Sequence, residues 1–163
     1  MKKSTPLTID AAHFKGALSQ FATGVTVITT RLANGNFWGI TASSFNSVSL
    51  DPPLVLWSLS QASTTLPLFT VNSHYVINVL AANQKSIADQ FSATGKDRFQ
   101  GIDYTLSPQG YPIINGATAW FECSNRRRYP EGDHIIFVGE VEKCEFTPGA
   151  PLLYHGGQLL GNE

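Results

Sequence analysis

Two runs of β-branched and aromatic residues flank the dipeptide Asn34-Gly35, and this arrangement is the strongest constraint on the fold. Asn-Gly is typical of a two-residue turn between antiparallel strands, because both residues tolerate the positive φ angles that such a turn requires. The first run is GVTVITTRL (24–32) and the second is FWGITASSF (37–45). The sequence therefore predicts an antiparallel hairpin at this point of the chain.

Further strands and helices are predicted on the C-terminal side of this hairpin. Proline cannot occupy the middle of a ladder, so the apolar run after Pro52-Pro53 predicts a strand that begins at residue 54 and ends at 60. Four later segments have the composition of strands: 73–81, 117–129, 134–146 and 151–160. The sequence PEGD (130–133) predicts the turn between the two long ones.

Helices are predicted at three places: at 8–22, as a short helix within 62–72 that starts near Ser63 to Thr65, and at 83–92. The first has Phe14, Ala17, Leu18 and Phe21 on one face, with Thr8 or Asp10 as its N-terminal cap. The Gly-, Asp- and Ser-rich segment 94–110 is expected to be a loop with a turn of helix.

Six or seven short antiparallel strands with two or three inserted helices favour a small, closed or nearly closed β-barrel over a doubly wound α/β sheet. The length of 163 residues suits a single domain over residues 1–163. Neither G-x-G-x-x-G nor G-x-x-x-x-G-K-[ST] occurs in the sequence, so a nucleotide would have to be bound in another way.

Charge and hydropathy exclude two classes of partner. The net charge is −1 with 11 Lys and Arg residues, and their one cluster, Arg126-Arg127-Arg128, gives no broad basic surface for nucleic acid. No window reaches the roughly 18 apolar residues that a membrane span needs, and no apolar segment follows Lys2 and Lys3. We therefore expect a soluble, cytoplasmic protein.

The cysteines and histidines do not suggest a metal centre. Cys123 and Cys144 lie too far apart in sequence for a metal knuckle, and we expect them to be free, buried thiols. The four histidines, His13, His74, His134 and His155, have no ligand spacing, so no metal site is expected.

The stretch GITASSFNSVSLDPPLV (39–55) is unusually rich in hydroxyl groups and has almost no charge. A second cluster follows at Ser58, Ser60, Ser63, Thr64 and Thr65. Hydroxyl and backbone N–H groups can hold a phosphate without strong positive charge. They can equally serve as caps and turn residues. On the residues alone the two interpretations have equal support.

Six blocks of this sequence, in order and covering about residues 14–155, resemble the short-chain flavin reductase family. The blocks are FATGVTVITT (21–30), GITASSFNSVSLDPPLV (39–55), SLSQASTTLPLF (58–69), INVLAANQKSIADQFS (77–92), DRFQGI (97–102) and GDHIIFVGEV (132–141). The resemblance implies an antiparallel, Greek-key-like split β-barrel that forms a homodimer. It also implies FMN or FAD near the subunit interface, NADH or possibly NADPH as hydride donor, and reduced flavin supplied to a partner monooxygenase.

The same resemblance assigns roles to individual residues. Flavin contacts are implied for fifteen residues: Thr41, Ala42, Ser43, Ser44, Ser58, Ser60, Ser63, Thr65, Val79, Leu80, Ala82, Gln84, Phe91, Arg98 and Phe99. The first four would lie along the flavin ring and ribityl chain, and the next four around its phosphate. His134 would border the nicotinamide, first as a binding group and second as a proton source, with Asp133 orienting its ring.

Several alternatives stay open at this point. Val79, Leu80 and Phe91 have spacings that a hydrophobic core would also require. The run Arg126-Arg127-Arg128 could pair with dinucleotide phosphates or could form a solvated turn that protects a barrel edge. The function could be that of an enzyme serving an oxygenase of an aromatic, phenolic compound, or that of a flavin-binding storage or sensing protein on the same barrel. A pyridoxine-phosphate oxidase relative is a third option, although the basic phosphate ligands usual in such enzymes are missing.

Overall fold

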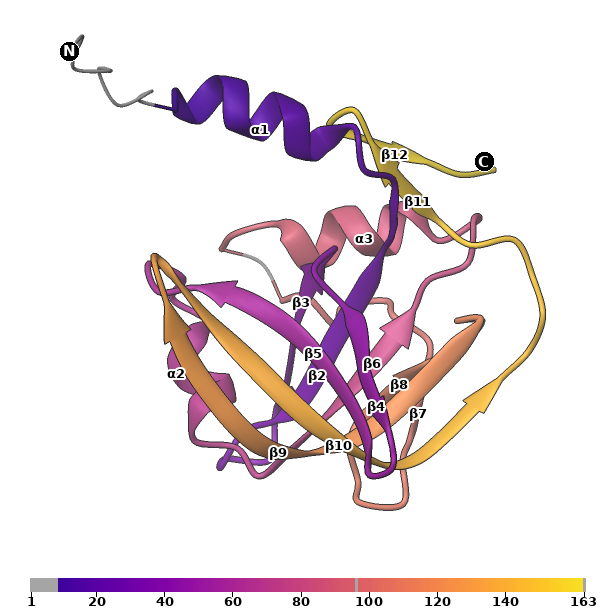
Figure 1. The fold of residues 1–163 in the computed structure, drawn as a ribbon. Coiled ribbons are helices and arrows are strands. Elements are labelled where there is room, and N and C mark those ends of the chain that lie inside the picture. Colours follow the sequence, from indigo (N-terminus) through magenta and orange to yellow (C-terminus); the bar gives the residue numbers. More distant parts are fainter. Residues whose placement is uncertain (1–8, 96, 163) are drawn as a thin grey trace, which may run out of the picture.

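The computed structural model describes residues 9–95 and 97–162, and their main feature is a curled seven-stranded antiparallel sheet (Figure 1). The described part contains three helices, α1 (Ala11–Ser19), α2 (Leu66–Thr70) and α3 (Lys85–Ser92). Its strands are β1 (Thr23–Gly24), β2 (Thr26–Arg31), β3 (Phe37–Ala42), β4 (Asn46–Leu50), β5 (Pro53–Ser60), β6 (His74–Val79), β7 (Tyr104–Leu106), β8 (Pro112–Ile114), β9 (Ala119–Glu131), β10 (His134–Phe146), β11 (Leu153–His155) and β12 (Gln158–Leu160).

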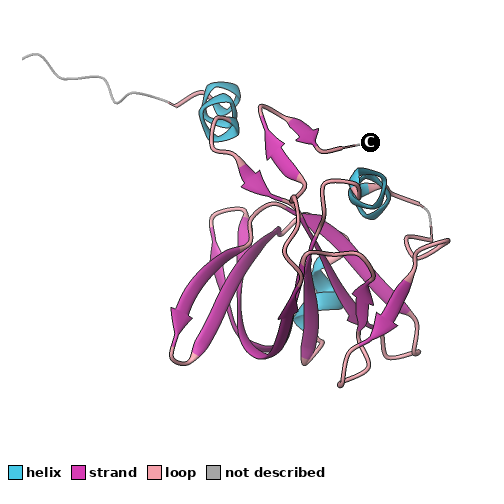
Figure 2. Ribbon diagram, turned by 90° about the vertical axis from the view of Figure 1, so that its right-hand side faces the viewer, coloured by secondary structure: helices cyan, strands magenta, loops and turns pink. Residues whose placement is uncertain are grey.

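The large sheet has the strand order β3-β2-β6-β9-β10-β5-β4, and all its pairs are antiparallel. The predicted hairpin is present as β2 and β3, but its loop is longer than the two residues expected, and of Asn34 and Gly35 only Gly35 has a positive φ. Two smaller sheets, β1-β11-β12 and β7-β8, lie beside the large one (Figure 2). The order brings β3 and β5 near each other without a ladder between them, as expected for a split barrel.

The two longest strands, β9 and β10, make the curvature of the barrel possible. Their pairing contains register shifts between Val138 and Gly139 and between Val141 and Lys143, and such irregularities bend and twist a strand. At Gly139 the absence of a side chain is required, because a Cβ would lie 2.5 Å from the hydroxyl of Tyr75. The barrel therefore closes around an interior aromatic residue.

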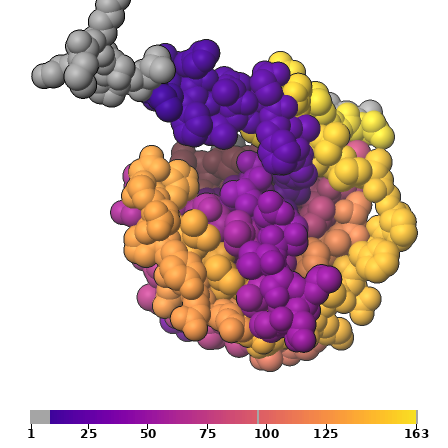
Figure 3. All heavy atoms as spheres, in the orientation of Figure 1, coloured from indigo at the N-terminus to yellow at the C-terminus, as the bar shows by residue number. Residues whose placement is uncertain are grey.

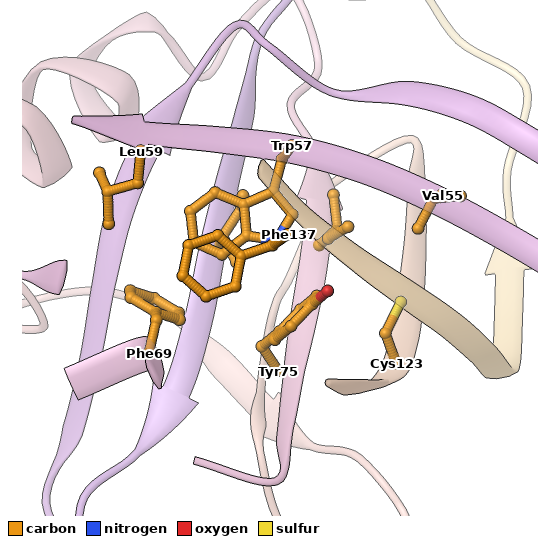
Figure 4. Close-up of a cluster of buried hydrophobic side chains, with 9 residues drawn as sticks. Val55, Trp57, Leu59, Phe69, Tyr75, Cys123 and Phe137 are labelled. Carbon is orange, nitrogen blue, oxygen red and sulfur yellow. The ribbon is translucent and has the colours of Figure 1, made fainter. Parts of the chain in front are cut away.

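The barrel interior is filled mainly by aromatic side chains (Figure 4). Trp57 and Phe137 stack with ring centroids 4.4 Å apart, and Phe69 and Tyr75 meet the Trp57 ring edge-on. Burial raises the pKa of the Tyr75 hydroxyl well above its ordinary value, so this group stays neutral. A second cluster joins the outer face of the barrel to α3, with Leu80, Phe91 and Leu152 among its buried members.

The structure corrects several sequence-based predictions. Residues 46–50 form the edge strand β4, which was not predicted because small polar residues dominate it. Strand β5 begins at Pro53 itself, as proline at the first position of a strand allows. The short helix predicted to start near Ser63 to Thr65 is present as α2, with Thr65 as its N-cap. The loop predicted at 94–110 contains strand β7, and the strand predicted at 151–160 is the hairpin of β11 and β12.

Two smaller corrections concern the turn at 130–133 and the thiols. Pro130 and Glu131 belong to β9, so the turn itself is shorter than predicted. Both cysteines are free, as expected, but only Cys123 is buried and Cys144 is exposed. Burial raises the pKa of the Cys123 thiol far above its ordinary value.

Helix α1 is shorter than predicted and stands apart from the barrel (Figures 1 and 3). Asp10 caps it by accepting the N–H of Ala12 at 3.3 Å, while Thr8 lies outside the described residues. Phe14, Leu18 and Phe21 are 52%, 57% and 74% exposed, so the described residues leave most of the predicted apolar face uncovered. In the described part of the chain, no helix is long and apolar enough to span a bilayer.

The contact between β3 and α3 makes one stability prediction. A Cβ at Gly39 would lie 2.6 Å from a ring carbon of Phe91, which is fully buried and cannot move aside easily. Gly39→Ala is expected to lower the free energy of unfolding by about 1–3 kcal/mol, measured by urea denaturation. Gly16→Ala in α1 is the control, because no neighbour lies within 4 Å and alanine favours a helix. Equal stability of the two variants would contradict this packing.

Candidate functional site

The two hydroxyl-rich segments meet at the split in the barrel. Ser44, just after β3, faces Ser58 of β5. The Ser44 hydroxyl accepts the N–H of Ser58 at 2.9 Å and donates to the Ser58 carbonyl at 3.2 Å. The Ser44 side chain thus forms the two hydrogen bonds to the backbone of Ser58 that a neighbouring strand would otherwise form. The predicted flavin residue Ser44 therefore also has a structural role, as a bridge across the split.

Strand β5 leads from this bridge to the second hydroxyl cluster. Ser60, at its end, is paired with His134 at the start of β10. The Ser60 carbonyl accepts the N–H of Ser63 at 3.0 Å, and the Ser63 hydroxyl accepts the N–H of Thr65 at 3.2 Å. The predicted phosphate residues and the predicted nicotinamide residue therefore lie at one end of the barrel.

Trp38 connects this cluster to Arg98. The indole N–H of Trp38 donates to the hydroxyl of Thr65 at 3.3 Å. The guanidinium of Arg98 lies over the Trp38 ring, 4.6 Å from its centroid, and donates to the carbonyls of Gly39 at 2.7 Å and Ala93 at 3.1 Å. Trp38 was not among the residues predicted from the sequence. The only indication of its role was its position in the predicted strand that leads into the hydroxyl-rich stretch 39–55.

Arg98 is a buried cation that lacks an acidic partner. It is 7% exposed, and within residues 9–95 and 97–162 no carboxylate forms an ion pair with it. Burial lowers its pKa from the ordinary value, which reflects the cost of a charge removed from water. Two carbonyls and a ring balance the charge only in part, so the site favours an anion.

The imidazole of His134 forms a pair with the adjacent Asp133. His134 Nδ1 lies 2.7 Å from a carboxylate oxygen of Asp133. This hydrogen bond, followed by the charge of His134, lowers the pKa of Asp133 below its ordinary value. The ionised carboxylate can only accept, so Nδ1 carries the proton and Nε2 is left free. The side chain of His134 is 47% exposed, so Nε2 is accessible to a ligand.

Two further elements surround this end of the barrel. Gln61, which was not predicted, donates through Nε2 to the carbonyls of Gly132 and His134 and so fixes the turn that carries the histidine. Helix α1 overhangs the same end, and Figure 3 shows a hollow in the surface beneath it. Lys15 of α1 is close enough to contribute, as a minor cause, to the lowered pKa of Asp133.

Thr41 and Ala42 lie on β3 between the Arg98 contact and Ser44. The Thr41 hydroxyl donates to the Ala88 carbonyl of α3 at 2.7 Å. Ala42 accepts the hydroxyl of Thr26 through its carbonyl at 2.7 Å, and Ser43 is exposed. Strand β3 therefore presents these predicted flavin residues along one continuous edge.

The remaining predicted flavin residues have clear structural roles away from the hydroxyl cluster. Leu80 and Phe91 belong to the second core cluster, and Phe99 packs edge-on against Phe91. Gln84 accepts the N–H of Ala81 at 2.9 Å and donates to the carbonyl of Asn115 at 2.9 Å. Val79 pairs with Thr26 and Ala119, and Ala82 lines a groove of about 500 Å³. Flavin contact by these residues stays a prediction.

The arginine run on β9 is partly engaged. Arg126 forms an ion pair with Glu140 at 2.7 Å, and Arg128 donates to the carbonyl of Thr70. Arg127 is exposed. Arg126 therefore links the two strands of the long hairpin and Arg128 links the hairpin to α2, which supports the structural interpretation more than a phosphate-binding one.

The sequence pattern of the flavin reductase like domain matches residues 18–162, so the chain belongs to that family, and the resemblance seen in the sequence is confirmed.

Relatives with assigned names agree with this assignment. The chain is 42% identical to the FMN reductase (NADH) SmoA of Agrobacterium fabrum, over 91% of this chain and 84% of that protein. It is 40% identical to the reductase component of the flavin-dependent trigonelline monooxygenase of Acinetobacter baylyi, over 89% of this chain and 47% of that protein. The chain thus spans about half the length of the Acinetobacter protein. The predicted class of enzyme, a flavin oxidoreductase, is confirmed.

A solved structure extends the similarity to the fold. The NADH:FAD oxidoreductase SgcE6 of Streptomyces globisporus, in complex with NAD and FAD fragments, superposes with a TM-score of 0.87. It is 36% identical, and the match covers 92% of this chain and 91% of that one. The predicted split β-barrel is therefore confirmed.

The bridge at the split leads to a second stability prediction. Ser44→Ala removes both hydrogen bonds to Ser58, and the free energy of unfolding should fall by about 1 kcal/mol because the site is exposed to water. Urea denaturation measures this change. The neighbouring Ser43→Ala is the control, since its exposed hydroxyl has no such bond, and its stability should match the wild type. A Ser44→Ala protein as stable as the control would show that the bridge contributes nothing.

Proposed function

We propose that this protein is an NAD(P)H-dependent flavin reductase that passes reduced FMN or FAD to a separate oxygenase. The observation that carries the proposal is the gathering of hydroxyl residues along β5 and the start of α2, where Ser44 bonds Ser58 and Thr65 is linked through Trp38 to the buried cation Arg98. A series of hydroxyls that ends at a buried guanidinium suits a polar chain with an anionic end, which is the chemistry of a ribityl phosphate.

The residues of the site suit a flavin that binds reversibly. Arg98 and Thr65 would hold the phosphate, and the edge of β3 with Ser43 and Ser44 would hold the ring and ribityl chain. When bound, the flavin supplies a two-electron acceptor for the hydride of a nicotinamide. The protein's contribution is then to bind and orient the two rings.

His134 has a binding role in this proposal. Its Nε2 can accept a hydrogen bond from the nicotinamide carboxamide, and Asp133 keeps the ring in the orientation that allows it. The exposed position of the pair suits contact with a second, exchanging substrate. As a secondary role, a protonated His134 would supply a proton at Nε2 from the solvent side.

Two partners are proposed: an oxygenase, from the similarity to known proteins, and a second copy of this chain, from the exposed apolar residues of α1. The relatives include reductase components of flavin-dependent monooxygenases, which supports an oxygenase partner reached by diffusing reduced flavin. We further propose that this oxygenase acts on an aromatic, phenolic compound, as the sequence resemblance implies. A homodimer is proposed because most of the apolar face of α1 is left exposed by the described residues of one chain.

Steady-state kinetics test the reductase activity and the role of His134 together. Purified protein with NADH and FMN should oxidise NADH continuously, whereas a storage or sensing protein gives no sustained turnover. His134→Ala is expected to raise KM for NADH by about 5- to 10-fold, the loss of one hydrogen bond, with a smaller effect on kcat. Arg127→Ala, an exposed change on the same hairpin, is the control. Unaltered kinetics of His134→Ala would remove this residue from the site.

The oligomeric state is tested by a change on α1. Phe14→Glu combined with Leu18→Glu places two charges on the apolar face, and the molar mass from light scattering should fall from that of a dimer to that of a monomer. Ser86→Glu on the exposed side of α3 is the control and should leave the mass unchanged. A wild-type protein that is monomeric at all concentrations contradicts the proposed homodimer.

A further inference from the structure

An open groove lies between the turn of the β2–β3 hairpin and the C-terminal end of α2. Its volume is about 910 Å³, and its walls include Arg31, Leu32, Leu68, Val71 and Tyr111. Pockets that bind small molecules have volumes of about 300–1,000 Å³ and are lined mainly by apolar side chains with a few polar groups. The groove therefore has the size and the lining of a small-molecule site.

This groove is separate from the proposed flavin site. Arg31 is paired with Phe37 between β2 and β3, so these two side chains lie on the same face of the hairpin. Trp38 follows Phe37 in the strand and faces the other way. On that other face it contacts Thr65 and Arg98. Among the described residues, none of the predicted flavin contacts lines the groove, so a ligand bound there would occupy a second site.

The guanidinium of Arg31 is held in place within the groove. Its central carbon lies 5.3 Å from the centroid of the Tyr111 ring. The backbone at Gly110 also approaches it closely, because a Cβ at that position would lie 2.7 Å from a guanidinium nitrogen. Stacking on an aromatic ring restrains a long side chain while its N–H groups stay available. Arg31 is therefore preorganised to bind a ligand.

The charge of Arg31 has no acidic partner. Within residues 9–95 and 97–162 its guanidinium forms no ion pair and no hydrogen bond. Two carboxylates around the Tyr111 segment have other partners, since Glu122 accepts the N–H of Gln109 and Glu142 pairs with His74. An arginine fork binds a carboxylate through two parallel hydrogen bonds. The groove therefore favours a ligand with a carboxylate group.

Apolar side chains beside Arg31 define the rest of the ligand. Val71, the C-cap residue of α2, is 82% exposed, and Leu32 and Leu68 are only half-buried. Exposed apolar side chains that line a concave surface often mark a binding site. A flat ring covers such side chains and loses less conformational freedom on binding than an alkyl chain does. The apolar part of the ligand is therefore expected to be an aromatic ring.

We propose that this groove binds a small aromatic carboxylate. Its carboxylate group pairs with the guanidinium of Arg31, and its ring packs against Leu32, Leu68 and Val71. The complementarity of charge and the apolar lining together identify this class of ligand. The inference goes beyond the proposed function and does not depend on it, because the groove shares no residue with the proposed flavin site.

The test is a titration of the flavin-free protein, followed by amide chemical shifts, with 3-phenylpropanoate and its neutral isostere 3-phenylpropanamide. The wild type should bind the carboxylate with a Kd of about 0.1–1 mM and the amide about 10-fold more weakly. Arg31→Gln should weaken the carboxylate about 10-fold and leave the amide within about 2-fold, because only the charged pair is lost. Val71→Ser should weaken both probes by the same factor, about 3-fold.

Controls separate this site from other cationic positions. Arg127→Gln removes an exposed arginine elsewhere and should bind both probes as the wild type does. Saturating FMN should leave the Kd of 3-phenylpropanoate unchanged, because the proposed flavin site lies apart from the groove. The shifted amides should cluster at residues 31–35 and 68–72. Circular dichroism and urea denaturation verify that each variant is folded.

Displacement of the carboxylate by FMN, or a loss of affinity in Arg98→Lys instead of Arg31→Gln, places the probe in the proposed flavin site and overturns the inference. Equal affinities of the wild type for the two probes, or no binding of either, also overturn it. A Kd that rises with protein concentration shows that a second copy of the chain occupies the groove instead. A protein that binds no flavin but keeps the Arg31-dependent affinity contradicts the proposed function and supports this inference.

Discussion

The guanidinium of Arg98 connects the parts of the molecule that build the candidate site. It holds the carbonyls of Gly39 on β3 and Ala93 after α3, and it stacks on Trp38, which in turn holds Thr65. A cation buried at 7% exposure is costly unless its surroundings compensate it. The same contacts that fix α3, β3 and the start of α2 therefore create a place where a negative charge is stabilised.

Much of the fold could be predicted from local patterns, and the errors have physical causes. The hairpin on Asn34-Gly35 and the long β-branched strands were correct because turn chemistry and periodicity act locally. Strand β4 was missed because its residues are small and polar and it is an edge strand, whose ladder to β5 gives no hydrophobic signal. Helix α1 has the expected apolar face, but the sequence does not say what covers it.

The candidate site was less predictable than the fold. The hydroxyl residues were found by composition, but sequence alone could not show that Ser44 bridges the split or that Gln84 clamps a loop. Trp38 was missed because contacts between distant strands leave no mark in a local pattern. Arg98 was assigned to the site by resemblance to the family. That it is buried with no acidic partner among the described residues could be seen only in the structure.

The position of His134 beside a short glycine turn has a consequence for how such a protein would exchange its ligands. Both His134 and Asp133 stand at the rim of the barrel, where solvent reaches them, while Arg98 lies deep. A molecule anchored at depth and open at the rim can meet a second molecule without any part of the chain having to open first. The rate at which such a molecule dissociates would then depend on how tightly its deep end is bound near Arg98. The lifetime of the complex would therefore be set at Arg98 and not at the rim, where the second molecule binds.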